Sequence, residues 1–246
     1  MKKNNNTKII FYFIIYFLLF FVLIYSGIKI YEWYRDKNKN NEIAQKIKET
    51  VIVESNGKNK EEYLIDFDKL KEQNNEAIAW IKVNNTNIEY PVVKTKNNEF
   101  YLNHSFDKSE NLGGWIFADY KNKFNGTDKN IVIYGHNMKD NSMFGTMQNI
   151  LNPEWYNNEE NTNIILKTEG KNYIYKVFSI YRIENEDYYI KTEFSNDSEF
   201  EQFLNTLKAR SIRDFNMDML ESDSILTLST CDNNNKYRVV LHAKKI

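Results

Sequence analysis

One cysteine and three histidines are the side chains of this 246-residue chain best suited to nucleophilic and acid–base chemistry. Cys231 follows an apolar run at 224–230 and precedes a loop of Asp and Asn, so we expect it at the rim of a sheet. A thiol is nucleophilic as its thiolate, which a neighbouring cation favours. Arg238 is such a cation, and its guanidinium could also bind the oxyanion that forms when a thiolate attacks a carbonyl. The alternative is a buried Cys231 that acts only as a small apolar residue.

The residues on both sides of the Asp/Asn loop predict a hairpin in which Cys231 faces Arg238. Side chains alternate between the two faces of a strand, so this register sorts the hairpin into a mostly polar face and an aliphatic core face. The expected pairs on the polar face are Ser229 with Val240 and Thr227 with His242, and the expected core face holds Leu226, Leu228, Val239, Leu241 and Ala243.

Cysteine acyl transfer also needs a proton carrier, which is usually a histidine. His242 lies roughly 13 Å beyond Arg238 along a strand that rises about 3.3 Å per residue, so it is too far from Cys231 and we assign it a structural role. His136 ends an apolar strand, a position that commonly carries chemistry, whereas His104 lies in a loop or short helix. Spacing favours His136 and leaves His104 as the second candidate.

Short apolar runs with turn residues between them predict the elements that position these side chains. Ile, Val, Tyr and Thr dominate the runs, and Asn, Gly, Asp and Lys bound them, which is typical of an all-β barrel or sandwich. One helix is expected at 198–210, just before the last two strands, and a shorter one after Asn141. The runs read AIAWIKV, NIEYPVV, GWIFAD, NIVIYGH, NIILKT, NYIYKVFSIYRI, SILTLSTC and KYRVVLHAKK.

The amino-terminal segment predicts a membrane anchor. Residues 9–28 carry no charge and would span about 30 Å as a helix, the thickness of a hydrocarbon core. The run is long for a cleavable signal peptide, so we expect an uncleaved signal anchor, although lysines and arginines on both flanks leave its orientation open. Two amphipathic helices are expected after it, one using Ile43, Ile47 and Val51, the other using Leu64, Ile65, Phe67 and Leu70 with Asp66 as N-cap.

Composition excludes several classes of protein. A single cysteine cannot form an intrachain disulfide or a multi-cysteine metal site. A formal net charge of -1 argues against a protein whose function is to bind the phosphates of nucleic acid. The sequence contains no P-loop, no GxSxG, no paired metal-ligand spacing and no compact acidic cluster suited to calcium.

Several segments resemble class B sortases. TLSTC at 227–231, YRVVLHAK at 237–244 and YGHNMKDNSMFG at 134–145 carry the resemblance, and NNEFYLNHSF, GGWIFADYKN and AWIKVNNTNIEYPVV extend it in the same order. The resemblance implies a mainly β fold, an eight-stranded β-barrel with N-terminal helices and a helix between its sixth and seventh strands, preceded by one transmembrane helix. The implied organisation is a short cytoplasmic N-terminus at 1–8, a transmembrane signal anchor at 9–28, a polar linker with an amphipathic helix at 29–62 and a catalytic domain at 63–246.

The resemblance also implies an activity. It suggests a cysteine transpeptidase on the outer face of a Gram-positive cell membrane, which cleaves a C-terminal NPxTN-like sorting signal after its threonine and passes the thioacyl group to an amine of a lipid II-type cell-wall precursor. Cys231 matches the nucleophile, His136 the acid/base and Arg238 the oxyanion-binding residue. No metal, cofactor or nucleic acid is implied; the partners are surface proteins with sorting signals, the cell-wall amine and the membrane. Asn98, Leu102, Tyr134 and Ser229 match positions around the sorting signal or beside the catalytic pair.

The sequence is also compatible with three other functions. A sortase that polymerises pilins would use a lysine acceptor, a cysteine protease would hydrolyse the acyl-enzyme, and a membrane-tethered β-barrel binding module would have no turnover. The loop between Cys231 and Arg238 is also shorter than in many class B sortases, which bears on how the residues after the threonine, or the acceptor amine, are held.

Overall fold

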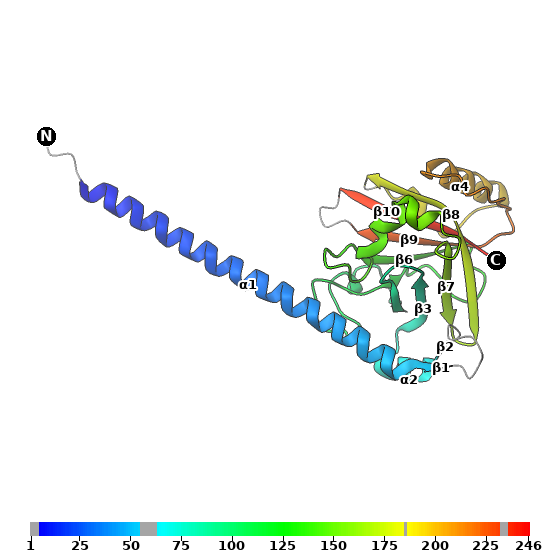
Figure 1. Cartoon of the computed structure of the whole chain (residues 1–246), viewed down its shortest axis with the longest axis horizontal. Helices are drawn as coiled ribbons and strands as arrows, with labels where there is room; N and C mark the ends of the chain where they lie inside the picture. The colour runs from blue at the N-terminus through cyan, green and yellow to red at the C-terminus, as the bar shows by residue number, and fades with distance from the viewer. Residues whose placement is uncertain (1–4, 55–62, 185, 232–235) are drawn as a thin grey trace. The chain divides into compact units, whose positions relative to one another are not determined.

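The computed structural model of the chain describes residues 5–54, 63–184, 186–231 and 236–246, with side chains except at 5–7, 52–54, 63 and 231. The chain divides into two compact units, Met1–Lys39 and Asn40–Ile246. The second unit holds all the strands (Figure 1). The predicted loop between Cys231 and Arg238 lies outside the described residues at 232–235.

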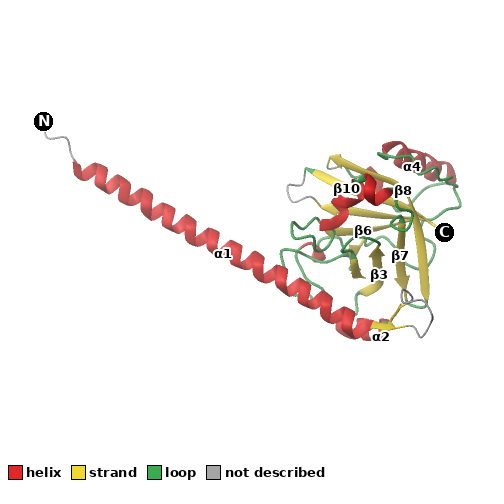
Figure 2. Ribbon diagram, viewed as in Figure 1, coloured by secondary structure: helices red, strands yellow, loops and turns green. Residues whose placement is uncertain are grey.

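The second unit is built around a closed β-barrel of eight strands in the order β10-β8-β7-β3-β4-β5-β6-β9 (Figure 2). Neighbouring strands are antiparallel except for β4 with β5 and β6 with β9. Buried aliphatic and aromatic side chains fill the barrel, as the alternating apolar runs of the sequence predict. The strands are β3 (Ala77–Val83), β4 (Glu89–Val93), β5 (Phe117–Ala118), β6 (Asn130–His136), β7 (Asn163–Thr168), β8 (Lys171–Glu184), β9 (Ile225–Cys231) and β10 (Tyr237–Lys245).

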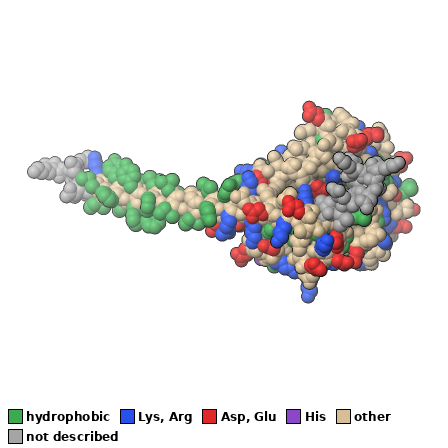
Figure 3. Space-filling view, turned by 60° about the horizontal axis from the view of Figure 1, so that its bottom comes forward, with side chains coloured by type: hydrophobic (Ala, Val, Ile, Leu, Met, Phe, Trp, Pro, Cys, Tyr) green, Lys and Arg blue, Asp and Glu red, His purple; other side chains and the backbone are tan. Residues whose placement is uncertain are grey.

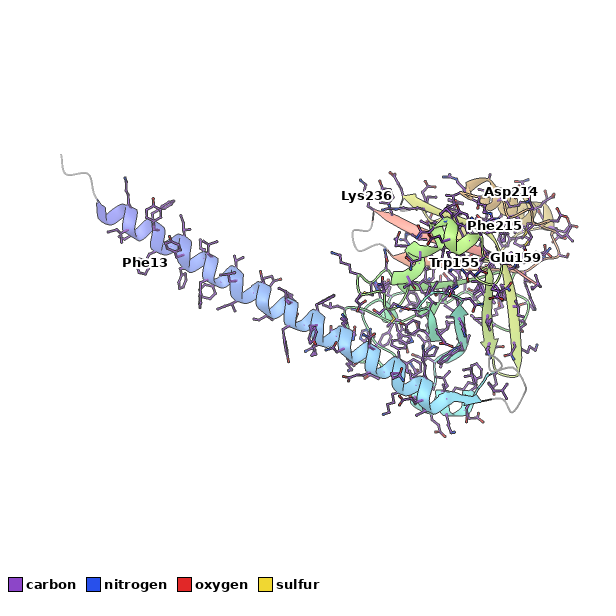
Figure 4. All side chains as sticks on the ribbon, viewed as in Figure 1. Phe13, Trp155, Glu159, Asp214, Phe215 and Lys236 are labelled. Atoms are coloured by element: carbon purple, nitrogen blue, oxygen red, sulfur yellow. The ribbon has the colours of Figure 1, made fainter. Side chains whose placement is uncertain are left out.

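The first unit consists of the amino-terminal part of one long helix, α1 (Asn5–Val51). A stretch of this helix reaches a mean hydropathy of 2.6 and is long and apolar enough to cross a membrane. Figure 3 shows hydrophobic side chains gathered along it, and Phe13, labelled in Figure 4, is 75% exposed. The helix therefore contains the predicted span at 9–28 as a candidate transmembrane segment.

The linker differs from the sequence expectation in two places. The stripe of Ile43, Ile47 and Val51 is helical, but it continues α1 without a break because no proline interrupts the segment after residue 28. Ile47 and Val51 are buried in the core of the second unit. Leu64 and Ile65 were expected in a helix, and this prediction is wrong: β2 (Tyr63–Ile65) pairs with β1 (Ile52–Glu54). The helix begins later, as α2 (Phe67–Gln73).

The remaining helices are short, apart from one on the outside of the barrel. Asp66 caps α2 by accepting a hydrogen bond from the amide of Lys69, as predicted. The expected short helix after Asn141 is a 3-10 helix, η2. The bounds are α2 (Phe67–Gln73), η1 (Phe100–Leu102), η2 (Gly145–Leu151), α3 (Pro153–Tyr156), η3 (Tyr188–Ile190) and α4 (Asp197–Arg210).

Helix α4 covers an outer face of the barrel and creates a second apolar cluster. It lies between the sixth and seventh barrel strands in chain order, as expected. The helix lies near β8 in Figure 1, and its buried stripe forms one apolar cluster with residues of β8 and β10. Asn196 caps the helix by accepting from the amide of Glu199. The buried stripe is Phe200, Phe203, Leu204 and Leu207.

The predicted hairpin register is confirmed. Val240 pairs with Ser229 and His242 with Thr227. The aliphatic face of the hairpin points into the barrel core, whereas Val240 lies in the outer cluster beneath α4. The polar face is therefore not open to solvent: Thr227 and Ser229 are fully buried.

Candidate active site

The carboxyl ends of β6 and β9 bring two of the predicted site residues together. These strands are parallel neighbours, and their ladder pairs Tyr134 with Ser229 and ends by pairing His136 with Cys231. Parallel strands of matched register end at the same edge of a sheet, so residues far apart in the chain become adjacent there. The pairing places the backbones of His136 and Cys231 side by side; the side chain of Cys231 is not among those described.

Arg238 enters from the third strand of this arrangement. Strand β10 is antiparallel to β9, and their ladder ends at the Val240–Ser229 pair. Arg238 lies two residues before Val240, on the same side of β10 and at the end of the hairpin where β9 reaches Cys231. Arg238 is half-buried, and its positive charge acts on Tyr134 in the opposite direction to the neighbouring carboxylate. Three strand ends thus place a cysteine, a histidine and an arginine at one edge of the barrel.

His136 is held by a backbone carbonyl. Its Nε2 lies 2.8 Å from the carbonyl oxygen of Leu102 in η1. A carbonyl oxygen only accepts, so Nε2 carries a proton and donates it, which leaves Nδ1 as the nitrogen that can exchange a proton with a substrate or a thiol. Burial lowers the pKa of His136 below its ordinary value, and the hydrogen bond to Leu102 opposes that shift. The imidazole is therefore mainly neutral near pH 7.

A buried carboxylate organises one side of this edge. Asp119, just after β5, accepts hydrogen bonds from the Asn98 amide and the Tyr134 hydroxyl, both at 2.8 Å. Burial and the Asp119 charge raise the pKa of Tyr134 far above its usual range, so its hydroxyl remains a donor at any physiological pH. Asn98 also accepts from the amide of Tyr120 at 2.9 Å. The predicted residues Asn98 and Tyr134 are thus joined through Asp119.

On the other side, Ser229 contacts η3. Its hydroxyl lies 2.9 Å from that of Tyr189, and both residues are fully buried. Leu102 is half-buried and contributes its carbonyl to His136. Of the four predicted substrate positions, Leu102, Tyr134 and Ser229 therefore lie next to the strand ends, and Asn98 is linked to them through Asp119.

The other two histidines lie in structural environments. His242 is fully buried between the Tyr181 hydroxyl and the Thr227 hydroxyl, each 2.9 Å from a ring nitrogen, and burial lowers its pKa to about 3. His104 stacks on the ring of Phe100, and its Nδ1 lies 2.8 Å from the carbonyl oxygen of Phe100. The structure places His242 in a buried polar environment, and it pairs the backbone of His136, not that of His104, with Cys231.

Sequence reasoning missed two residues of this site. Asp119 lies in the segment GGWIFADYKN, and an acidic residue that directly follows an apolar strand was the available signal. Tyr189 offered no such signal, because nothing in the sequence around it indicates that its hydroxyl contacts Ser229 in the folded protein. Among the described residues, no group of three or more His, Cys, Asp or Glu side chains is arranged to hold a metal ion.

The chain is similar in sequence and in fold to known proteins. Residues 81–246 match the sortase domain family model. Sortase B of Listeria monocytogenes is 33% identical over 233 residues, covering 92% of each chain. A crystal structure of sortase B from Bacillus anthracis in complex with AAEK2 superposes with a TM-score of 0.75 at 30% identity, covering 85% of this chain and 96% of that one. A Staphylococcus aureus sortase B–substrate complex gives 0.69 at 34% identity, covering 73% and 84%.

Proposed function

The chain belongs to class B of the sortase family of cysteine transpeptidases, and from this premise we propose that it cleaves an NPxTN-like C-terminal sorting signal of surface proteins after the threonine. The acyl group passes to Cys231 and then to an amine of a lipid II-type cell-wall precursor. A sortase B of 34% identity is known in complex with a substrate, which supports a sorting-signal peptide as the ligand here. The pairing of His136 with Cys231 at the ends of β6 and β9 is the observation that carries the proposal.

The proposed mechanism assigns one role to each of three residues. The Cys231 thiolate attacks the threonine carbonyl, and the guanidinium of Arg238 donates hydrogen bonds to the oxyanion that develops. His136, protonated at Nδ1 in the reactive form, gives this proton to the leaving amide nitrogen and later takes one from the incoming amine. The Nε2–H bond to Leu102 keeps the ring oriented through both steps.

The neighbouring residues supply the binding surface in this proposal. The sorting signal lies along the edge at Leu102, above the buried side chains of Tyr134 and Ser229, with Asn98 at one side. Because the hydroxyls of Tyr134 and Ser229 are already engaged by Asp119 and Tyr189, their contribution is to shape and support this surface. Peptide specificity then depends on backbone groups and apolar contacts as much as on these side chains.

The proposed location is the cell membrane, with a single pass and the catalytic unit outside the cell. The apolar part of α1 supports this proposal by its length and composition. A cysteine-labelling experiment on whole cells tests the orientation: a membrane-impermeant thiol reagent should modify the single Cys231 without lysis. Labelling that requires permeabilised cells would contradict an external catalytic unit.

Mass spectrometry of the detergent-solubilised full chain, mixed with a small set of sorting peptides, tests the chemistry. We expect an acyl adduct on Cys231 whose mass corresponds to the peptide up to and including its threonine. An added amine should release this adduct. Cys231→Ala should abolish the adduct, and His136→Ala and Arg238→Ala should lower turnover at least about a hundredfold in folded protein. His104→Ala serves as the matched control and should retain activity.

The outcomes separate the alternatives. Release only by water would identify a cysteine protease, and preference for a lysine side chain over a cell-wall amine would identify a pilin-polymerising sortase. A folded protein whose Cys231 forms no adduct with any sorting peptide, and does not react with thiol-directed probes, would identify a binding module and refute the proposal.

A further inference from the structure

Three buried amide and hydroxyl side chains join helix α1 to the loop before β5. Asn40, the first residue of the second unit, is 3% exposed, and Ser105 and Asn111 are 0% and 2% exposed. The Asn40 amide nitrogen donates to Asn111 Oδ1 at 3.1 Å and to the carbonyl oxygen of Gly114 at 3.0 Å. Its carbonyl oxygen accepts from the Ser105 hydroxyl at 2.6 Å. Buried polar groups cost free energy unless they are paired, so Asn40 has one defined orientation here.

The backbone that Asn40 holds lies directly against the catalytic histidine. Gly114 has a φ of +54°, and a Cβ built there would come within 2.9 Å of His136 Cδ2 and 2.8 Å of the Leu102 carbonyl oxygen. The next residue, Trp115, donates its amide to the carbonyl of Tyr101 at 2.9 Å. The segment at 114–115 therefore packs beside both the imidazole and the carbonyl that binds its Nε2.

The turn that leads to Gly114 depends on the same network. Asn111 Oδ1 also accepts from the amide of Gly113 at 2.9 Å, and its main-chain carbonyl accepts from the amide of Gly114 at 3.0 Å. The main-chain amide of Asn111 donates to the carbonyl oxygen of Asn103 at 2.9 Å, and Asn103 directly follows Leu102. Removing the Asn40 amide would leave the Gly114 carbonyl without that donor and loosen the side of the turn that faces His136.

We propose that Asn40 of helix α1 is a positioning residue for His136, acting through Gly114 and the Leu102 carbonyl. It contacts neither the substrate nor the reacting atoms. Instead it holds the backbone that keeps the imidazole in a fixed orientation at the strand end beside Cys231, and proton transfer depends steeply on such placement. The inference rests on the proposed role of His136 as proton carrier, and it assigns to the carboxyl-terminal part of α1 a role in catalysis beyond connecting the apolar segment to the barrel.

Three variants of the full chain in detergent test the inference. Asn40→Ala removes both donated hydrogen bonds and the accepted one, and Asn40→Asp keeps the shape but cannot donate to Gly114 or Asn111. Ile47→Val is the matched control, because the apolar side chain of Ile47 is buried on the same helix and packs in the hydrophobic core. Circular dichroism and thermal denaturation establish that each variant is folded at the assay temperature.

The decisive readouts are the kinetic parameters and the imidazole signals in ¹⁵N NMR, assigned by comparison with His136→Ala. In Asn40→Ala and Asn40→Asp we expect kcat to fall about tenfold or more with KM within about twofold, and the His136 Nε2–H signal to be lost or to exchange rapidly. Ile47→Val should retain both the kcat and the signal.

An unchanged Nε2–H signal and kcat in folded Asn40→Ala would overturn the inference. So would an equal loss of kcat in Ile47→Val, because it would indicate general destabilisation. The NMR signal reports the placement of His136 whether or not this residue is catalytic. Full activity in His136→Ala would therefore refute the proton-carrier role itself, which distinguishes failure of the proposed function from failure of the Asn40 inference.

Discussion

The burial of His242 predicts a specific dependence of stability on pH. The ring is fully buried between Tyr181 and Thr227, and its pKa falls to about 3, against an ordinary value of about 6.5 in the unfolded chain. At pH values between these two pKa values, His242 is protonated in the unfolded state and neutral in the folded state. The contribution of His242 is therefore complete above about pH 6.5 and is lost progressively as the pH falls towards 3.

The magnitude follows from the two pKa values. At pH 5 the unfolded chain gains about 2 kcal/mol of protonation free energy at this residue relative to pH 8, which the folded chain does not gain. Other groups also titrate in this interval, including His136, whose pKa is lowered in the same direction. A His242→Gln variant removes only the contribution of His242, because glutamine can still donate and accept hydrogen bonds but does not titrate.

Chemical denaturation between pH 5 and pH 8, followed by tryptophan fluorescence, measures this difference. Trp80 and Trp115 are fully buried in the second unit and report its unfolding. Between pH 8 and pH 5 we expect the free energy of unfolding of the parent protein to fall by about 2 kcal/mol more than that of His242→Gln. A pH-independent effect of the substitution on stability does not change this difference. Parallel curves for the two proteins would refute the reasoning, and would mean that His242 is hydrated or protonated in the folded state.

Three further predictions follow from the site and the barrel. The cysteine–histidine pair reacts when it carries one proton in total, so the acidic limb of the pH profile of kcat/KM reports the addition of a second proton, which leaves a thiol beside a protonated His136. Because burial lowers the pKa of His136, the midpoint of this limb should lie below about 6.5; a midpoint above that value would contradict the assignment. Asp119→Ala should reduce the free energy of unfolding by about 3 kcal/mol, measured by denaturation, because it leaves the buried Tyr134 hydroxyl and the half-buried Asn98 amide without their acceptor; a loss below about 1 kcal/mol would contradict this. Leu204→Ala, which empties a buried position of α4, should lower stability by about 3 kcal/mol while the folded enzyme keeps its kcat; a lowered kcat would show that α4 acts on the active site.

The hairpin of β9 and β10 was predictable in detail because its information is local. Two alternating runs joined by a short polar loop allow few registers. The predicted register turns five apolar side chains to one face and leaves Val240 on the face with the polar residues; the five are Leu226, Leu228, Val239, Leu241 and Ala243. The same reasoning predicted the apolar stripe of α4 and the N-cap at Asp66. This reasoning was wrong at Leu64 and Ile65. The apolar pattern there is too short to distinguish a helix from a strand, and pairing with β1 makes the segment a strand.

The sequence by itself determined the eight barrel strands, the position of the single cysteine at a strand end and an apolar segment long enough to cross a membrane. Only the tertiary structure decided which histidine accompanies Cys231, because β6 and β9 are parallel neighbours that no local pattern connects. It also decided the carbonyl that holds Nε2, the Asp119 acceptor and the Asn40 contact to Gly114. These contacts join segments distant in the chain, and they exist only because closing the barrel brings those segments together.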